Sequence, residues 1–106
     1  MSKSVVCLAD VRGPRPGWSQ YELLQLHRTA KLLRDAGICL ETDSGVTDER
    51  EPWFVLCDDE SNEVIVHFAR LSGMYVICSP FLKGSLSGGA FPDVIDRFLR
   101  RILGKR

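Results

Sequence analysis

Metal-binding and disulfide patterns are missing from this sequence. It contains only two histidines and four cysteines, and no cysteines form a CxxC pair. Cys7, Cys39, Cys57 and Cys78 have no histidine at metal-ligand spacing and are too widely spaced for a dense disulfide framework. All four lie in apolar, strand-like segments, so we expect free, buried thiols in a reducing compartment. Neither a bound metal nor a cofactor is expected.

Long hydrophobic runs are also missing. The apolar run at residues 5–9 stops at Asp10 and is too short for a signal peptide. No stretch approaches the roughly 20 apolar residues that a membrane-spanning helix needs. These absences predict a cytoplasmic protein that does not contact a membrane.

The chain has no net charge, because 14 basic residues balance 14 acidic residues, but the charges are unevenly distributed. Residues 41–63 contain nine acidic residues and one basic residue, Arg50, so this segment has a charge of −8 and the remainder a charge of +8. Such acidic segments are typical of solvated loops. The separation also suits a partner with its own charge pattern, or a head-to-tail contact between two copies.

The length of 106 residues fits one domain, which we place at residues 1–106. Near its start, residues 4–11 are apolar enough for a short strand, and residues 12–17 contain the prolines and glycines of a linker. We therefore interpret residues 1–17 as a flexible or strand-forming N-terminal arm.

Three apolar runs between residues 52 and 79 organise the rest of the chain. The joints between them, at residues 58–62 and 72–73, contain Asp, Ser, Asn and Gly, which favour turns. The runs therefore predict a three-stranded antiparallel meander over residues 52–79.

Neither face of this meander is polar. Alternation along the first run places Trp53, Val55 and Cys57 on one face and Phe54 and Leu56 on the other. The second and third runs show the same apolar character on both faces. A sheet that is wet on one side shows apolar–polar alternation instead, so both faces need to be covered.

Two segments have helical periodicity, residues 19–36 and residues 92–103. In the first, Ser19 and Glu22 have the S-x-x-E spacing of a capping box, and Gly37 suits a left-handed residue after the helix. The second begins near a proline and ends in arginines, which suits the helix dipole.

The remaining segments complete an α+β fold. Residues 38–41 are predicted to form a further short strand, residues 42–51 an acidic loop, and residues 80–91 an irregular connection. The sequence thus predicts an antiparallel sheet of about four strands with two amphipathic helices packed on one side.

The second apolar face must be covered by something other than the two helices, because these cover only one side of the sheet. The N-terminal strand, the 80–91 connection or another subunit could cover it, and a homodimer is the favoured solution. The candidate interface residues are the large aromatics of the meander, one pair of which should belong to the core: Trp53, Phe54, Phe68 and Tyr75.

A basic C-terminal helix supports an alternative function. It carries Arg97, Arg100 and Arg101, and Lys83 lies in the glycine-rich segment before it. These four residues are the candidate contacts for an anion or a nucleic acid. The segment lacks the nucleotide-binding G-x-x-x-x-G-K-[ST] pattern, and the isoelectric point of about 6.7 is not typical of a nucleic-acid module.

The order of a helix followed by a hairpin, over residues 19–79, loosely resembles the restriction-endonuclease-like nucleases. The resemblance implies a Mg²⁺ site formed by Glu51 with Asp43 or Asp48. The E-x-K motif of that family is absent, because the corresponding strand has the sequence Val66-His67-Phe68-Ala69-Arg70. The resemblance thus implies either a metal-dependent nuclease-like domain or a degenerate relative that only binds.

A thiol–imidazole pair is a further catalytic hypothesis. Cys57 and His67 lie on adjacent predicted strands and could form a nucleophile and its base. A packed thiol beside a half-buried imidazole explains both residues without catalysis. No catalytic residue is therefore assigned.

The sequence favours a small regulatory or adaptor domain that acts through protein–protein contact and self-association. A nucleic-acid-associated protein is the first alternative, and an enzyme of the nuclease type is the second. Partner and pathway are not encoded in any motif.

Overall fold

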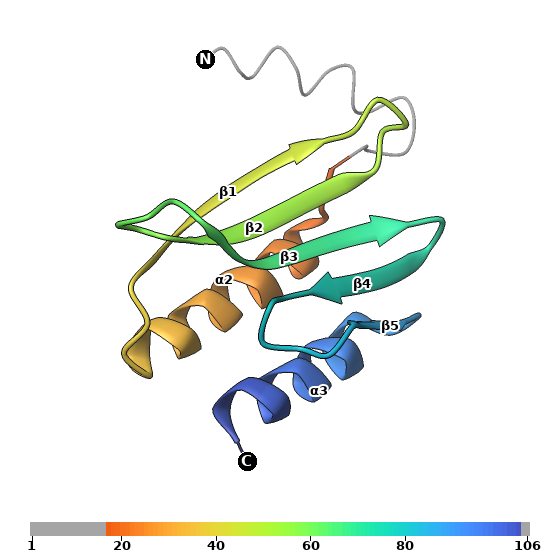
Figure 1. Cartoon of the computed structure of the whole chain (residues 1–106). Helices are drawn as coiled ribbons and strands as arrows, with labels where there is room; N and C mark the ends of the chain where they lie inside the picture. The colour runs from red at the N-terminus through yellow and green to blue at the C-terminus, as the bar shows by residue number, and fades with distance from the viewer. Residues whose placement is uncertain (1–16, 105–106) are drawn as a thin grey trace.

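The computed structural model describes residues 17–104, so the proposed arm at residues 1–17 lies outside this range except for Gly17. In chain order the elements are α2 (Gln20–Asp35), β1 (Leu40–Val46), β2 (Pro52–Asp58), β3 (Val64–Leu71), β4 (Met74–Cys78), β5 (Ser85–Gly88) and α3 (Phe91–Leu103). The five strands form one antiparallel sheet in the order β1-β2-β3-β4-β5 (Figure 1). The predicted α+β fold is confirmed, with five strands instead of about four.

Helix α2 begins where the capping box places it. The Glu22 amide donates to Ser19 Oγ at 3.1 Å, and the Ser19 amide donates to Glu22 Oε1 at 2.8 Å. These two bonds satisfy backbone donors that have no partner inside the helix. After Asp35 the chain turns at Gly37, whose φ is +99°, a conformation that glycine adopts without strain. Within residues 17–104, neither helix is long and apolar enough to cross a membrane.

Strand β1 extends through the segment that we predicted to be an acidic loop. Residues 40–46 pair with β2 along their whole length, from Leu40 opposite Asp58 to Val46 opposite Pro52. Most side chains of β1 are polar, so the sequence lacks the apolar pattern that predicts a strand. A polar strand is stable here because its backbone bonds to β2, while Leu40 packs in the core and most of its other side chains remain in water at the sheet edge.

Strand β5 lies inside the segment that we predicted to be irregular. Its four residues pair with β4, from Tyr75 opposite Gly88 to Cys78 opposite Ser85. Only Leu86 carries an apolar side chain, and it is buried against the core. The 80–91 segment therefore forms the second sheet edge instead of a free connector.

Both helices pack on the same face of the sheet, as Figure 1 shows. The core lies between them and contains, among others, Leu26, Leu33, Phe54, Leu56, Val66, Phe68, Ile77, Leu86, Val94 and Phe98. The predicted alternation of Phe54 and Leu56 against Trp53 is confirmed, because both of the former are buried in this core. Among residues 17–104 no helix covers the opposite face, which we call the open face.

The β3–β4 turn provides a test of local backbone strain. Its two residues, Ser72 and Gly73, have φ angles of +51° and +79°. Positive φ at both positions is the type I′ geometry, which favours Asn-Gly, whereas serine is strained there by its Cβ. We expect Ser72→Asn to raise the free energy of unfolding by about 0.5–1 kcal/mol in urea denaturation. Gly73→Ala should have the opposite effect, and an unchanged midpoint for both would contradict the assigned geometry.

Candidate functional site

The centre of the open face is apolar and uncharged. Strand register places Trp53, Ala69 and Val76 in one row across β2, β3 and β4. The next row contains Val55 on β2, His67 on β3 and Cys78 on β4. Residues directly opposite each other in an antiparallel pair share a face, so these side chains form one continuous surface.

Among the strand residues of these rows, charged side chains lie at the β1 margin. On β1, Asp43 lies opposite Val55 and Glu41 lies opposite Cys57, and both carboxylates are exposed. On β5, at the other margin, the corresponding positions are Ser85 and Ser87. The open face therefore changes from acidic at β1 to neutral at β5.

Trp53 is held flat over the β1–β2 pair. A Cβ atom built on Gly45 would lie 2.5–2.9 Å from atoms of the Trp53 indole, so the ring occupies the space above this glycine. Val55 and Ala69 are buried beside it, although no helix within residues 17–104 covers them. Toward the β3–β4 turn, Leu71 and Met74 remain 41% and 43% exposed, which is unusual for large apolar side chains that lie together.

Three of the four predicted interface aromatics do not lie on the open face. Phe54 and Phe68 are 2% and 0% exposed and belong to the core, so they are the core pair that we anticipated. Tyr75 points to the helix side, where its ring stacks on Phe91 with centroids 4.5 Å apart. Only Trp53 remains as an interface candidate from that set. Alternation could have assigned the faces, but only the helices decide which face is covered.

A buried polar cluster links α2 to the sheet, and sequence analysis did not identify it. Arg70 Nη1 lies 2.6 Å from Glu22 Oε1, and the Tyr75 hydroxyl donates to Glu22 Oε2. Arg70 Nη2 also donates to the Gly17 carbonyl at 3.2 Å, and the guanidinium lies 5.7 Å from the centre of the Trp18 ring. Each charged group in this cluster has a partner, so we interpret the cluster as structural.

These contacts change the pKa values of the cluster in opposite directions. Burial opposes ionisation of Glu22 and is the largest single influence, but hydrogen bonds from Tyr75, Ser19 and Arg70 together hold its pKa below the ordinary value. Burial and the hydrogen bond to Glu22 raise the pKa of Tyr75. An ionised Glu22 and a neutral Tyr75 are therefore the stable combination.

Two of the four predicted anion-binding residues make polar contacts within the chain. Arg97 Nη2 donates to the Ser87 carbonyl at 2.6 Å, and its Nε lies 3.4 Å from Asp93. Arg100 pairs with Asp96 at 2.9 Å. Arg97 and Arg100 are therefore paired with acidic residues of their own helix, whereas Lys83 and Arg101 are exposed and remain candidate contacts. Arg97 thus links α3 to one backbone carbonyl of strand β5.

The thiols and histidines are placed differently from our predictions. His67 lies directly opposite Cys78 on β4, whereas Cys57 is opposite Val64, so the proposed Cys57–His67 pair is not a direct cross-strand neighbour. Burial lowers the pKa of His67.

Cys39 and Cys78 are exposed free thiols and Cys57 is half-buried, which corrects the expectation of buried thiols. Cys39 lies outside the strands, and Cys78 ends β4 on the open face.

The acidic residues suggested by the nuclease resemblance do not converge. Asp43 lies on β1, while Glu51 Oε2 accepts a hydrogen bond from the Ser72 amide at 3.2 Å. Among residues 17–104, no group of three or more His, Cys, Asp or Glu side chains is arranged to hold a metal ion.

No known protein family, curated protein or solved structure matches the chain.

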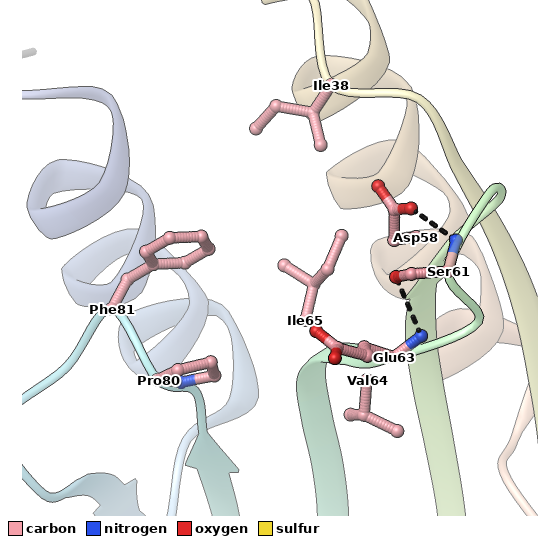
Figure 2. A pocket seen from close by; sticks show the side chains of 8 residues that line it. All are labelled: Ile38, Asp58, Ser61, Glu63, Val64, Ile65, Pro80 and Phe81. Atoms are coloured by element: carbon pink, nitrogen blue, oxygen red, sulfur yellow. Dashed lines mark hydrogen bonds between the residues drawn. The ribbon is translucent and has the colours of Figure 1, made fainter.

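A groove of about 470 Å³ opens at the end of the sheet where β2 passes into β3. Figure 2 shows its lining residues: Ile38, Asp58, Ser61, Glu63, Val64, Ile65, Pro80 and Phe81. A second hollow of about 310 Å³ adjoins it, shares Ile38 and Phe81, and reaches Arg101 and Ile102 on α3. The Phe81 ring is 62% exposed and stands at the margin of both hollows.

Proposed function

We propose that this chain is a regulatory or adaptor domain that acts in the cytoplasm by protein–protein contact and forms a homodimer through its open face. The observation that carries the proposal is the uncharged, apolar centre of this face, where no helix of the described residues covers Trp53, Val76 and Met74. The three free thiols among residues 17–104 support a reducing compartment.

The energetics favour a dimer that dissociates on dilution. Burying ~500 Å² of apolar surface contributes on the order of 12 kcal/mol before costs. Association itself costs about 4–15 kcal/mol in lost translation, rotation and side-chain freedom. The surplus is small, so self-association should depend on protein concentration.

The charge distribution selects one symmetry for this dimer. Two sheets packed face to face lie about 10 Å apart. A two-fold axis parallel to the strands places β1 of one copy over β5 of the other, so Asp43 of each copy faces the serines of its partner. An axis perpendicular to the strands would place the acidic β1 strands over each other, which is electrostatically unfavourable.

Molar mass measured by light scattering over a concentration series tests the proposal. We expect a mass that rises toward twice 11.9 kDa for the parent chain at high micromolar concentration. Met74→Asp should remain folded and monomeric, because it places a charge in the apolar contact. The buffer should have a pH above 6.5, where His67 is neutral.

A matched control replaces an equally exposed leucine on the other side of the molecule. Leu32 on α2 is 45% exposed, close to the 43% of Met74, so Leu32→Asp should leave the dimer intact. Trp53→Asp provides a second open-face variant, which should also lose the dimer. A parent chain that remains monomeric throughout the series would refute the proposal, as would equal effects of Met74→Asp and Leu32→Asp.

A further inference from the structure

The groove beside Phe81 lies at the end of the sheet where β2 passes into β3, outside the rows at the centre of the open face. The Phe81 amide donates to Ser79 Oγ at 3.2 Å, and this buried hydroxyl donates to the Ile65 carbonyl at 2.8 Å. The next residue, Leu82, is buried in the core. Phe81 is thus directed outward by a hydrogen-bonded turn anchored on both sides, and its exposure contributes nothing to the core.

The opposite wall of the groove is apolar with an acidic rim. Figure 2 shows Ile38 and Ile65 across from Phe81, with the carboxylates of Asp58 and Glu63 beside them. Within residues 51–69 the chain contains no lysine or arginine, and the turn from β2 to β3 adds two further acids to this rim. No basic side chain lines this part of the groove.

The carboxylates of Asp58 and Glu63 differ in their hydrogen-bond partners. Asp58 Oδ2 accepts hydrogen bonds from the amides of Glu60 and Ser61 at 3.1 and 2.8 Å, and these bonds lower its pKa, so it stays ionised. Glu63 makes no side-chain hydrogen bond or ion pair with any residue in the 17–104 range. A charge beside an apolar wall, with no internal partner, is available to an incoming cation.

We propose that this groove binds a short segment of a partner protein in which a lysine or arginine adjoins a bulky apolar side chain. The apolar group would pack between Phe81 and Ile38, and the cation would reach Glu63 and Asp58. At the far end, Arg101 repels a second cation and favours a polar or acidic continuation of the segment. This site goes beyond the proposed dimer, because none of its residues belongs to the rows at the centre of the open face.

Isoleucine methyl signals in the NMR spectrum of the full chain test this inference. Ile38, Ile65 and Ile102 line the two hollows, whereas Ile77 and Ile95 are 0% and 5% exposed and serve as internal controls. The probes are the blocked peptides acetyl-Gly-Arg-Phe-Gly-amide and acetyl-Gly-Arg-Leu-Gly-amide, with the Glu-Phe peptide as the charge-reversed control. We expect the arginine peptides to shift the three groove signals and to leave the two core signals unchanged.

Two variants locate the contacts, each with a control. Phe81→Ala should abolish the shifts, while Leu32→Ala should not. Glu63→Gln should weaken binding by up to about fivefold, as expected for an exposed charge pair, while Glu49→Gln in the β1–β2 turn should have no effect. Phe81→Ala should also leave the molar mass series unchanged, which keeps this test independent of the dimer.

Three outcomes would overturn the inference. One is the absence of groove shifts with both arginine peptides. Another is an equal response to the arginine and glutamate peptides, which would remove the role of the acidic rim. The third is a shift of the groove signals with protein concentration alone, which would identify a second copy as the occupant.

Discussion

Replacing Glu22 with alanine is expected to lower the free energy of unfolding by about 3 kcal/mol. The substitution leaves Arg70 without its carboxylate, the Tyr75 hydroxyl without its acceptor and the Ser19 amide without its cap. Removing one partner of a buried ion pair usually costs about 3–5 kcal/mol, and the lower end applies here because the Arg70 side chain is 25% exposed. Urea denaturation followed by circular dichroism measures the loss.

An exposed ion pair on the same helix provides the control for this effect. Lys31 and Asp35 lie 3.1 Å apart with side chains 73% and 61% exposed. Asp35→Ala should therefore change stability by no more than about 0.5 kcal/mol. If the two substitutions had similar effects, the Glu22 cluster would not have the stabilising role assigned to it.

The same cluster predicts a dependence of stability on pH. The pKa of Glu22 is lower in the folded chain than its ordinary value of 4.5, so the unfolded chain binds the proton more tightly. The stabilisation is complete above pH 4.5 and is lost as the pH falls through the folded pKa. The stability difference between the parent chain and Glu22→Gln should therefore shrink on acidification through this window. A difference that stays constant would contradict the assigned shift.

The second large effect is expected at the centre of the core. Phe68 is fully buried, and its ring meets Phe54 and Phe98 edge to face at centroid distances of 6.1 and 6.0 Å. Phe68→Ala removes contacts that join β2, β3 and α3 and leaves a cavity, so we expect a loss of about 3–5 kcal/mol. Domains of this kind are stable by only about 5–15 kcal/mol, so the variant should be close to unfolding at room temperature.

Phe81 supplies a matched control for the core substitution. It is the same residue type but is 62% exposed, so Phe81→Ala should alter the free energy of unfolding by no more than about 0.5 kcal/mol. Thermal melts of the two variants should differ by tens of degrees by the usual scaling for a domain of this size. Equal melting temperatures would contradict the assignment of Phe68 to the core and of Phe81 to the surface.

The sequence by itself determined the elements whose signals are local. The capping box places the start of α2 at Ser19 because its two bonds form within one turn of chain. The meander follows from apolar runs separated by turn residues, and the assignment of Trp53 and Phe54 to opposite faces follows from backbone geometry alone. Such features need no knowledge of distant residues.

Only the tertiary structure decided the features that depend on distant neighbours. Strands β1 and β5 carry few apolar side chains, and they are strands because β2 and β4 offer backbone partners at the sheet edges. The Glu22, Arg70 and Tyr75 side chains meet across 48 and 53 positions of sequence, a contact that no local pattern encodes. Which apolar face remains open was likewise decided by the side on which both helices pack, because the two faces of the meander are nearly equal in hydrophobicity along the chain.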